Sequence, residues 1–393
     1  MRGGVGFAKA APHDYSAPMT GLDIFATKLS ALEGRGRLRT LSPRSGRDFA
    51  SNDYLGLACD PTIAQAVADA IGQGVPVGSG GSRLLRGNAP EHEALEAKAA
   101  AFFGAEAALF LANGFAANLA IFSTLPQRGD LVVADELIHA SVHDGLRQSK
   151  AAYLFARHND AQSFDDLIAG WRAEGGKGQI WIAAETLYSM DGDVAPVDLL
   201  GEVCARHGAI LVLDEAHGTG VFGPKGKGIG AHLEGRADVV SLHTCGKAMG
   251  AEGALICGPK IIIDYLVNRA RPFIFSTAPS PLMAVAVSAA LDRVVEGDDL
   301  RARLLDLRGE ADDAICARLG LPMSRSQIIP VVIGDDKKTM AAATALQAAG
   351  FDVRGIRPPT VPAGTSRLRI SLTLNVGKSD IQALGDALQG ILA

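Results

Sequence analysis

The sequence predicts an α/β fold, with a mainly parallel sheet covered by helices on both faces and a smaller α+β domain after it. The composition, 48% hydrophobic with 5% aromatic residues and 46 glycines among 393 residues, is typical of α/β enzymes and argues against disorder. Short apolar runs alternate with helical patterns through the middle of the chain, and this rhythm changes at about residue 283. The length allows two or three domains.

The apolar runs in the middle of the chain define the expected strands. They cover residues 107–112, 130–135, 179–185, 209–214, 238–244 and 253–258. Strands that are apolar throughout and separated by helices indicate a sheet buried on both faces, and such sheets bind ligands at the carboxyl ends of their strands. We expect an N-terminal segment over residues 1–55, a large domain over 56–282 and a small C-terminal domain over 283–393.

Charge and composition exclude several classes of partner. The formal net charge of −5 lacks the basic footprint of a nucleic-acid-binding protein. Five scattered cysteines without a CxxC pair indicate reduced thiols, with no disulfide frame and no metal site. Two uncharged windows, 107–127 and 272–291, are interrupted by prolines or asparagines, so we expect no membrane span. The N-terminus lacks the apolar core of a signal peptide, and we expect a cytoplasmic protein.

The segment AILVLDEAHGTG (209–220) supports two different chemistries. Its letters DEAH spell a box that helicases use to hold magnesium and ATP. Such an ATPase also needs G-x-x-x-x-G-K-[ST] upstream, whereas the one Gly-Lys-Ser of this chain, at 377–379, follows the box and lacks the first glycine. The ATPase interpretation is therefore not supported. Glu215, essential to it, is expected to be a structural or solvent-side residue.

A pyridoxal-phosphate site is the alternative, because this cofactor needs an amine for a Schiff base and a carboxylate near its ring nitrogen. Asp214 ends an apolar run, and His217 is close enough to turn back toward the same ring. Lys247 lies in a glycine-bounded loop after the next run, with Thr244 beside it. Singly, a lysine is usually on the surface and an aspartate after a strand often caps a helix. The ordered set is much more specific.

Three upstream segments add groups to the same edge of the sheet. In NGFAAN a helix opens directly after a strand, so backbone N–H groups near Gly114 and Phe115 could bind phosphate. His139 follows the next strand, where its imidazole could lie against a pyridine ring. Glu185 and Ser189 follow a further strand.

Six segments in the same order give the chain a family resemblance. They are SNDYLGL (51–57), GSGGSRL (78–84), ETLYSMDGD (185–193), LDEAHGTGVFG (213–223), HTCGKAMG (243–250) and RPPTVPAGTSRLRISL (357–372). Together they resemble the α-oxoamine synthases, which are fold-type-I pyridoxal-phosphate enzymes, over about nine-tenths of the chain. The resemblance implies a seven-stranded, mainly parallel sheet and pyridoxal 5'-phosphate as cofactor. The second and last segments are most similar to the member that joins L-alanine to a pimeloyl thioester in biotin biosynthesis.

The resemblance also implies roles for individual residues around the cofactor. Lys247 holds the cofactor and later takes the Cα proton of alanine, while Asp214 keeps the ring nitrogen protonated. His139 stacks on the ring. His217 and Ser189 resemble the groups around the phenolic oxygen.

On the substrate side, Arg369 resembles the arginine that binds the alanine carboxylate, a role suited to its two-pronged guanidinium. Three further residues resemble substrate contacts: Asn52, Thr360 and Arg39. Ser276 and Thr277 resemble residues that reach the phosphate of the neighbouring subunit, which implies a homodimer with shared active sites.

Several alternatives stay open at this stage. Sibling synthases use glycine or serine with other acyl thioesters, and their motifs are similar. The acyl carrier could be coenzyme A or an acyl-carrier protein. The arginine-rich stretch 35–47 could meet either acidic carrier or could simply be solvated. A DNA-binding regulator with this fold would need an added helix-turn-helix segment, for which we see no room before the first motif.

Overall fold

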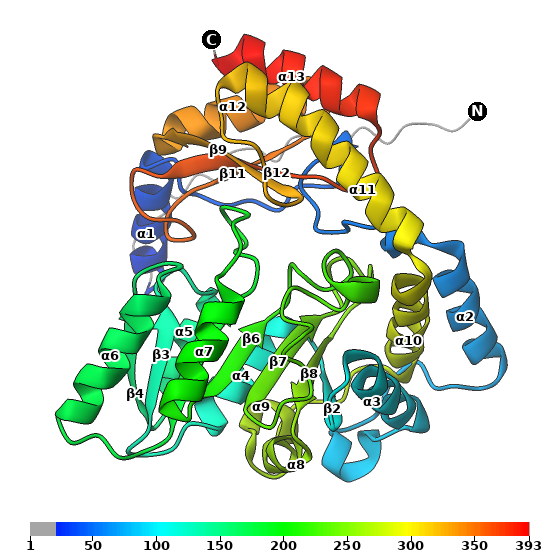
Figure 1. Cartoon of the computed structure of the whole chain (residues 1–393). Coiled ribbons are helices and arrows are strands. Elements are labelled where there is room, and N and C mark those ends of the chain that lie inside the picture. Colours follow the sequence, from blue (N-terminus) through cyan, green and yellow to red (C-terminus); the bar gives the residue numbers. More distant parts are fainter. Residues whose placement is uncertain (1–20, 393) are drawn as a thin grey trace.

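A seven-stranded sheet forms the centre of the protein in the computed structural model, which describes residues 21–392 (Figure 1). Its strands are β2 (Ala107–Leu111), β3 (Leu131–Asp135), β4 (Ala152–Ala156), β5 (Ile180–Glu185), β6 (Ile210–Asp214), β7 (Val239–Thr244) and β8 (Ala254–Gly258). The strand order is β2-β8-β7-β6-β5-β3-β4, and β8 is antiparallel to both neighbours while the other pairs are parallel. The predicted mainly parallel sheet is therefore confirmed.

One strand of this sheet was missed by the sequence interpretation. β4 lies at the edge and pairs only with β3, and four of its five residues are exposed. Residues 151–156, AAYLFA, are apolar throughout, so the criterion used for the other strands applied to this run as well, and it was overlooked. The six predicted strands all form, each with one end shifted by one residue.

Helices cover both faces of the sheet (Figure 1). They include α3 (Pro90–Phe103), α4 (Gly114–Thr124), α5 (Ala140–Gln148), α6 (Ala161–Ala173), α7 (Val197–His207), α8 (Lys260–Arg269), α9 (Arg271–Ile274) and α10 (Pro281–Glu296). α2 (Pro61–Gly72) packs against α10, away from the sheet. Alternate residues of one strand enter opposite cores: Leu131 and Val133 pack with the α6 and α7 side, and Val132 packs with the α4, α5 and α8 side. Burial on both faces explains why the strands are apolar throughout.

A smaller α+β unit lies over the carboxyl ends of the parallel strands (Figure 1). Its antiparallel sheet has the order β11-β12-β9, formed by β9 (Ile328–Gly334), β11 (Arg354–Ile356) and β12 (Ser366–Ser371). The helices α11 (Asp298–Ala311), α12 (Asp336–Ala348) and α13 (Lys378–Leu392) accompany it. The predicted boundary at 282/283 falls within α10, which packs against α2 and α3. The division into domains stays a prediction.

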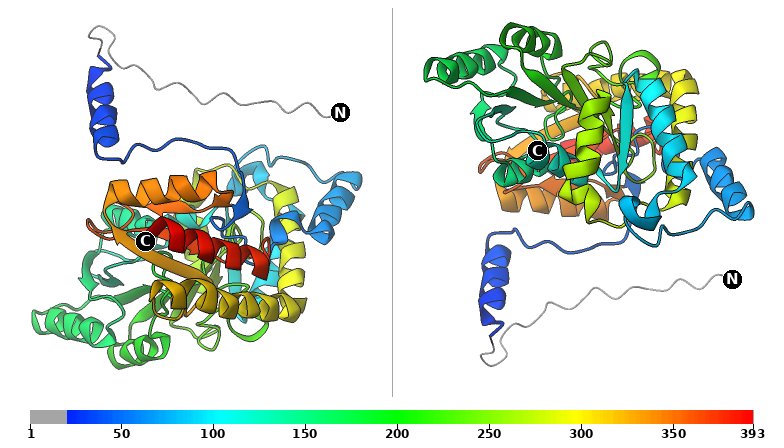
Figure 2. Two further views of the ribbon diagram at one scale, coloured as in Figure 1. Left: turned by 90° about the horizontal axis from the view of Figure 1, so that it is seen from above. Right: turned by 90° about the horizontal axis from the view of Figure 1, so that it is seen from below.

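The N-terminal segment reaches the small unit rather than the large sheet. β1 (Arg47–Asp48) pairs in parallel with β10 (Phe351–Asp352). Before it, α1 (Asp23–Gly34) has no buried residue and stands clear of the body in Figure 2. Within residues 21–392, no helix has both the length and the apolar composition needed to cross a bilayer. The unmatched residues 1–18 lie outside the described part of the chain.

Candidate active site

Lys247 lies in the turn after β7 and is half-buried. The Nζ atom is 2.6 Å from Nε2 of His217. Burial lowers the pKa of Lys247 to about 8, although the negative charges of Asp214 and Glu185 oppose this shift. The amine can therefore lose its proton close to neutral pH, as a nucleophile or base requires.

Asp214, the last residue of β6, is held by two donors. Its Oδ2 accepts a hydrogen bond from Nδ2 of Asn118 at 2.7 Å, and its Oδ1 accepts one from the backbone N–H of Ala216 at 2.9 Å. Asn118 was missed by the sequence interpretation, although it lies in NGFAAN. It is four residues after Gly114, one turn along α4 on the same face, and this spacing could have identified it.

Glu185 ends β5 directly opposite Asp214 in the sheet register. Burial and the neighbouring charge of Asp214 raise the pKa of Glu185 to about 8, so its carboxyl group is mainly protonated at neutral pH. Its Oε1 is buried without a hydrogen-bond partner among the described residues. The structure thus brings two predicted carboxyl groups together, and one of them still has an unused polar atom.

The two predicted histidines come from different loops, and both are neutral. Burial lowers the pKa of His217 far below its usual value, and the charges of Lys247 and Arg369 add to this. Burial also lowers the pKa of His139, whose Nδ1 accepts the backbone N–H of Ser141 at the start of α5. The Oγ of Ser141 lies 2.7 Å from the same Nδ1. These contacts fix the plane of the His139 ring.

The phosphate-binding residues predicted at the start of α4 lie beside the end of β7. The side chain of Asn113 caps the helix by accepting the backbone N–H of Ala116 at 2.8 Å. A Cβ atom placed on Gly114 would lie 3.6 Å from Oγ1 of Thr244, so these two predicted residues are neighbours. A helix N-terminus next to a hydroxyl group is suited to an anion. Phe115 is partly exposed on the outer side of this turn.

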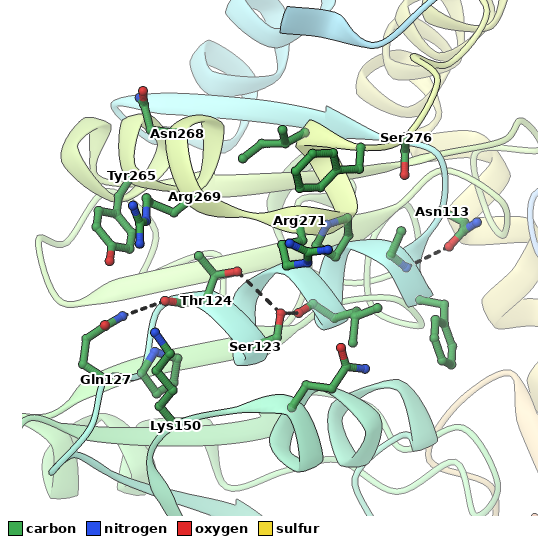
Figure 3. A pocket seen from close by; sticks show the side chains of 18 residues that line it. Asn113, Ser123, Thr124, Gln127, Lys150, Tyr265, Asn268, Arg269, Arg271 and Ser276 are labelled. Carbon is green, nitrogen blue, oxygen red and sulfur yellow. Dashed lines mark hydrogen bonds between the residues drawn. The ribbon is translucent and has the colours of Figure 1, made fainter.

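A cavity of about 830 Å³ opens on the outer side of the same helix (Figure 3). Figure 3 shows Ser276 on the same side of this cavity as Asn113. Ser276 and Thr277 follow α9, and both are exposed. Their predicted contact with a second subunit requires a second copy of the chain, so it stays a prediction.

Arg369, on β12, joins the small unit to the loops of the large sheet. Its Nε donates to the carbonyl oxygen of Ser189 at 2.6 Å, and its Nη1 donates to Oγ of Ser371 at 2.7 Å. Its Nη2 lies 3.4 Å from the hydroxyl group of Tyr54, which also donates to Oδ1 of Asn52 at 3.0 Å. The predicted residues Arg369, Ser189 and Asn52 are thus within one network, with Tyr54 as an unpredicted member.

Arg39 and Thr360, the two remaining residues predicted to contact substrate, form a hydrogen bond with each other at the surface. Nη2 of Arg39 donates to Oγ1 of Thr360 at 3.1 Å, although 321 residues separate them in the sequence. Arg39 also lines a cavity of about 400 Å³ formed between α1 and the segment containing Pro358 and Pro359. The structure therefore brings Arg39 and Thr360 together, at an exposed position.

Glu215 is buried, so the solvent-side alternative was wrong and the structural alternative holds. Its carboxylate accepts hydrogen bonds from Oγ1 of Thr186 at 2.7 Å and from the backbone N–H groups of Ile229 and Gly230. These bonds attach the loop after His217 to the end of β5. The carboxylate is occupied by structural donors.

A half-buried ion pair supports the loop that carries His139. His158 lies 2.8 Å from Oδ1 of Asp135 and 2.7 Å from Oδ2 of Asp193. Burial alone would lower the pKa of His158, but the two carboxylates outweigh it and raise the value to about 10. The imidazolium ion thus joins the end of β3 to the ETLYSMDGD loop.

Replacing His158 by glutamine is expected to lower the free energy of unfolding by roughly 1–3 kcal/mol at pH 6. The folded-state pKa is above the unfolded value near 6.5, so the contribution is complete below pH 6.5 and is lost as pH rises through about 10. Urea unfolding of both proteins at pH 6, 8 and 10 measures this. A stability difference that grows with pH would contradict the assignment.

Comparison with known proteins defines the class of the molecule. Residues 46–388 match the family described as "Aminotransferase class I and II", so the chain belongs to that family. The 8-amino-7-oxononanoate synthase of Anaeromyxobacter dehalogenans (strain 2CP-1) is 42% identical over 388 residues, which cover 94% of this chain and 96% of that protein. The resemblance to the α-oxoamine synthases is thereby confirmed.

Two solved structures share the fold. The serine palmitoyltransferase of S. paucimobilis with a bound pyridoxal phosphate–myriocin aldimine has a TM-score of 0.84 at 25% identity, with 94% of this chain and 97% of that one covered. The 8-amino-7-oxononanoate synthase of Francisella tularensis has a TM-score of 0.74 at 27% identity, with 88% and 98% covered. The predicted fold-type-I architecture is confirmed, and similarity of fold alone does not separate these two activities.

Proposed function

We propose that the chain condenses L-alanine with a pimeloyl thioester to give 8-amino-7-oxononanoate, carbon dioxide and a free thiol, with pyridoxal 5'-phosphate as cofactor. The observation that carries the proposal is the amine of Lys247, which lies 2.6 Å from Nε2 of His217 and has its pKa lowered to about 8, in a site that also holds the carboxylate of Asp214 and the carboxyl group of Glu185. The 42% identity to a named 8-amino-7-oxononanoate synthase supports the choice of substrates.

The residues present fit this cofactor. One edge of the sheet brings together an amine, a carboxylate held at a strand end, two neutral imidazoles and a helix N-terminus. In addition, Oε1 of Glu185 is buried there without a hydrogen-bond partner among the described residues. When bound, pyridoxal phosphate supplies an electron sink for the negative charge that develops on the amino-acid Cα. Lys247 would attach it, Thr244 and the first turn of α4, with Gly114 and Phe115, would bind its phosphate, and Ser189 and His217 would lie at its phenolic oxygen.

The proton transfers are assigned to groups whose environment suits them. Lys247, neutral above about pH 8, takes the Cα proton of alanine and returns a proton to the same carbon after decarboxylation. Asp214 keeps a proton on the ring nitrogen, and Asn118 holds the carboxylate in place at 2.7 Å. His139 is neutral and fixed by Ser141, so it can lie against the ring without adding charge.

Arg369 is assigned to the carboxylate of alanine. Its Nε and Nη1 atoms are held at 2.6 and 2.7 Å by Ser189 and Ser371, whereas its Nη2 makes only the long 3.4 Å contact with Tyr54. The guanidinium is therefore oriented by two short bonds and retains donor capacity for a carboxylate. Asn52 borders the same position. The new bond joins Cα of alanine to the thioester carbonyl carbon while the C–S bond breaks.

The acyl substrate is assigned to the side where Arg39 touches Thr360. Arg37 and Arg39 line the 400 Å³ cavity there, and apolar residues of α1 form another wall. Guanidinium groups beside an apolar wall suit an acyl chain with anionic ends. Either carrier of the thioester, coenzyme A or an acyl-carrier protein, would bring a phosphate group close to these guanidinium groups.

We also propose that the enzyme works as a homodimer. α1 has no buried residue, and the 830 Å³ cavity beside α4 is open along residues that include Phe115 and Ser276. A second copy covering these surfaces would bring Ser276 and Thr277 toward the phosphate site of its partner. Sedimentation measurements test the dimer, and complementation between Lys247→Ala and Ser276→Ala subunits tests the shared site.

The substrates are tested by a matrix of amino acids and thioesters. Purified enzyme is incubated with alanine, glycine or serine, each with pimeloyl-, acetyl-, succinyl- or palmitoyl-coenzyme A, and carbon dioxide and free thiol are measured. We expect turnover with alanine and the pimeloyl thioester. Activity confined to serine with the palmitoyl thioester, or to glycine, would instead identify a sibling synthase. Repeating the assay with pimeloyl-acyl-carrier protein compares the carriers.

A further inference from the structure

The 276–280 segment, which connects α9 to α10, is hydrogen-bonded to a distant part of the chain. The backbone N–H of Ala278 donates to the carbonyl oxygen of Gly81 at 2.9 Å. Oγ of Ser79 donates to the carbonyl oxygen of Pro279 at 2.5 Å, although 200 residues separate the two in the sequence. The conformation of this segment therefore depends on residues that are far away in the sequence.

His92, in the first turn of α3, is a second side chain that binds the carbonyl oxygen of Pro279. It has no exposed surface, and its Nε2 lies 2.8 Å from that oxygen. Its Nδ1 lies 3.1 Å from the backbone nitrogen of Ala89. A backbone N–H can only donate and a carbonyl oxygen can only accept, so the imidazole carries its proton on Nε2 and is neutral. Burial lowers the pKa of His92, which agrees with a neutral ring.

A two-pronged ion pair fixes the surroundings of His92. Nη1 and Nη2 of Arg83 donate to the two carboxylate oxygens of Glu96, each at 2.9 Å. The same carboxylate accepts the backbone N–H of Phe110 in β2 at 2.8 Å. The guanidinium of Arg83 also lies 5.8 Å from the centre of the Phe273 ring in α9. The part of the chain that binds Pro279 is thus attached both to the large sheet and to the helix before the 276–280 segment.

We propose that His92, together with Ser79, is a positioning residue that holds the 276–280 segment in the conformation in which its side chains reach the phosphate of the cofactor in the partner subunit. The proposal rests on the proposed function, in which Ser276 and Thr277 complete the neighbouring site. Both of these residues are exposed, so they are accessible to a second copy of the chain. A segment that is already ordered loses less entropy on binding, so the hydrogen bonds to Pro279 should increase the affinity of the neighbouring site for its cofactor.

Two variants of His92 separate its two hydrogen bonds. In His92→Asn the shorter side chain keeps an acceptor near the position of Nδ1, for the N–H of Ala89, but has no donor that reaches Pro279. In His92→Gln an amide N–H lies near the position of Nε2 and can donate to Pro279, while the bond to Ala89 is lost. A residue that only stabilised the start of α3 would tolerate His92→Asn better, whereas the positioning role predicts that His92→Gln is the milder change.

The test uses dimers of the full-length chain that carry a different affinity tag on each subunit. One subunit carries Lys247→Ala, so pyridoxal 5'-phosphate attaches covalently only to the other subunit, and a titration followed by absorbance gives the half-saturating concentration. When His92→Asn is placed in the Lys247→Ala subunit, half-saturation is expected to require about three- to tenfold more cofactor, the effect of one net hydrogen bond. When His92→Asn is placed in the subunit that keeps Lys247, the half-saturating concentration is expected to stay unchanged.

The arrangement of the two changes distinguishes positioning from a general loss of stability. An equal loss in both arrangements, a loss confined to the subunit that keeps Lys247, or no loss in either overturns the proposal. The proposal also fails if His92→Gln weakens attachment as much as His92→Asn does. Ser79→Ala removes the other donor to Pro279 and is expected to act in the same direction, so it replaces His92→Asn if that variant does not fold.

A reference dimer separates this proposal from the proposed function. It carries Ser276→Ala and Thr277→Ala in the Lys247→Ala subunit and tests the shared site directly. If the reference dimer binds the cofactor more weakly while His92→Asn has no effect, the positioning role is overturned and the shared site is retained. If the reference dimer binds as well as the unaltered one, the shared site and the positioning role are both overturned.

Discussion

Replacing Lys247 by alanine is expected to lower kcat for product formation by on the order of 10⁴-fold or more. The change removes the group assigned both to attach the cofactor and to move the Cα proton, and no other lysine among the described residues approaches His217 so closely. Release of free thiol from pimeloyl-coenzyme A in the presence of alanine measures the effect. The variant is also expected to lose the cofactor on gel filtration, as judged by absorbance.

Lys260→Ala is the control for this change. Lys260 is exposed at the start of α8 and pairs with Asp264 at 2.7 Å. The change therefore removes the same kind of side chain far from the edge of the sheet where Lys247 lies. Its activity is expected to stay within about twofold, because exposed ion pairs contribute little to stability. Activity of Lys247→Ala within tenfold of the unaltered enzyme would refute the assigned chemistry.

Replacing Asp214 by asparagine is expected to lower kcat by on the order of 10²- to 10³-fold, the range found when one electrostatic contact to a transition state is lost. The amide has nearly the same shape and can still accept from Asn118, but it carries no charge to keep the ring nitrogen protonated. The negative charge of Asp214 also raises the pKa of Lys247, so the basic limb of the amine should move to lower pH.

The profile of kcat against pH separates these two effects of Asp214→Asn, and thermal unfolding shows whether the fold is retained. Asp238→Asn is the control, because Asp238 is only partly buried and pairs with Arg236 at the other end of the parallel strands. A loss of similar size in Asp238→Asn would mean that the effect of Asp214→Asn is one of stability rather than chemistry.

The residues that could be predicted from the strand pattern of the sequence end an apolar strand or lie in the segment just after one. Lys247, Asp214 and Glu185 are of this kind, because the carboxyl ends of parallel strands meet at one edge of the sheet whatever the packing of the helices. Arg369 and Asn52 were identified by resemblance, and their position depends on how β12 and the segment after β1 lie over that edge.

The residues that were missed depend on packing that a sequence does not display. The i, i+4 spacing places Asn118 on the same face of α4 as Gly114, but that it reaches Asp214 depends on how α4 packs against the sheet. Tyr54 reaches His217 from 163 residues away, through the contact of the N-terminal segment with the small unit. The antiparallel direction of β8 was also hidden, because a fully buried apolar run reads the same in both directions.

The pairing of β1 with β10 has a consequence for the order in which the chain can fold as it leaves the ribosome. All seven strands of the large sheet lie between residues 107 and 258, so this sheet can assemble while the last third of the protein is still being translated. The segment from α1 to Tyr54 is translated before this sheet, yet its partners Phe351, Thr360 and Arg369 are translated after the sheet. This early segment can therefore take its place only after the strands of the large sheet have been made.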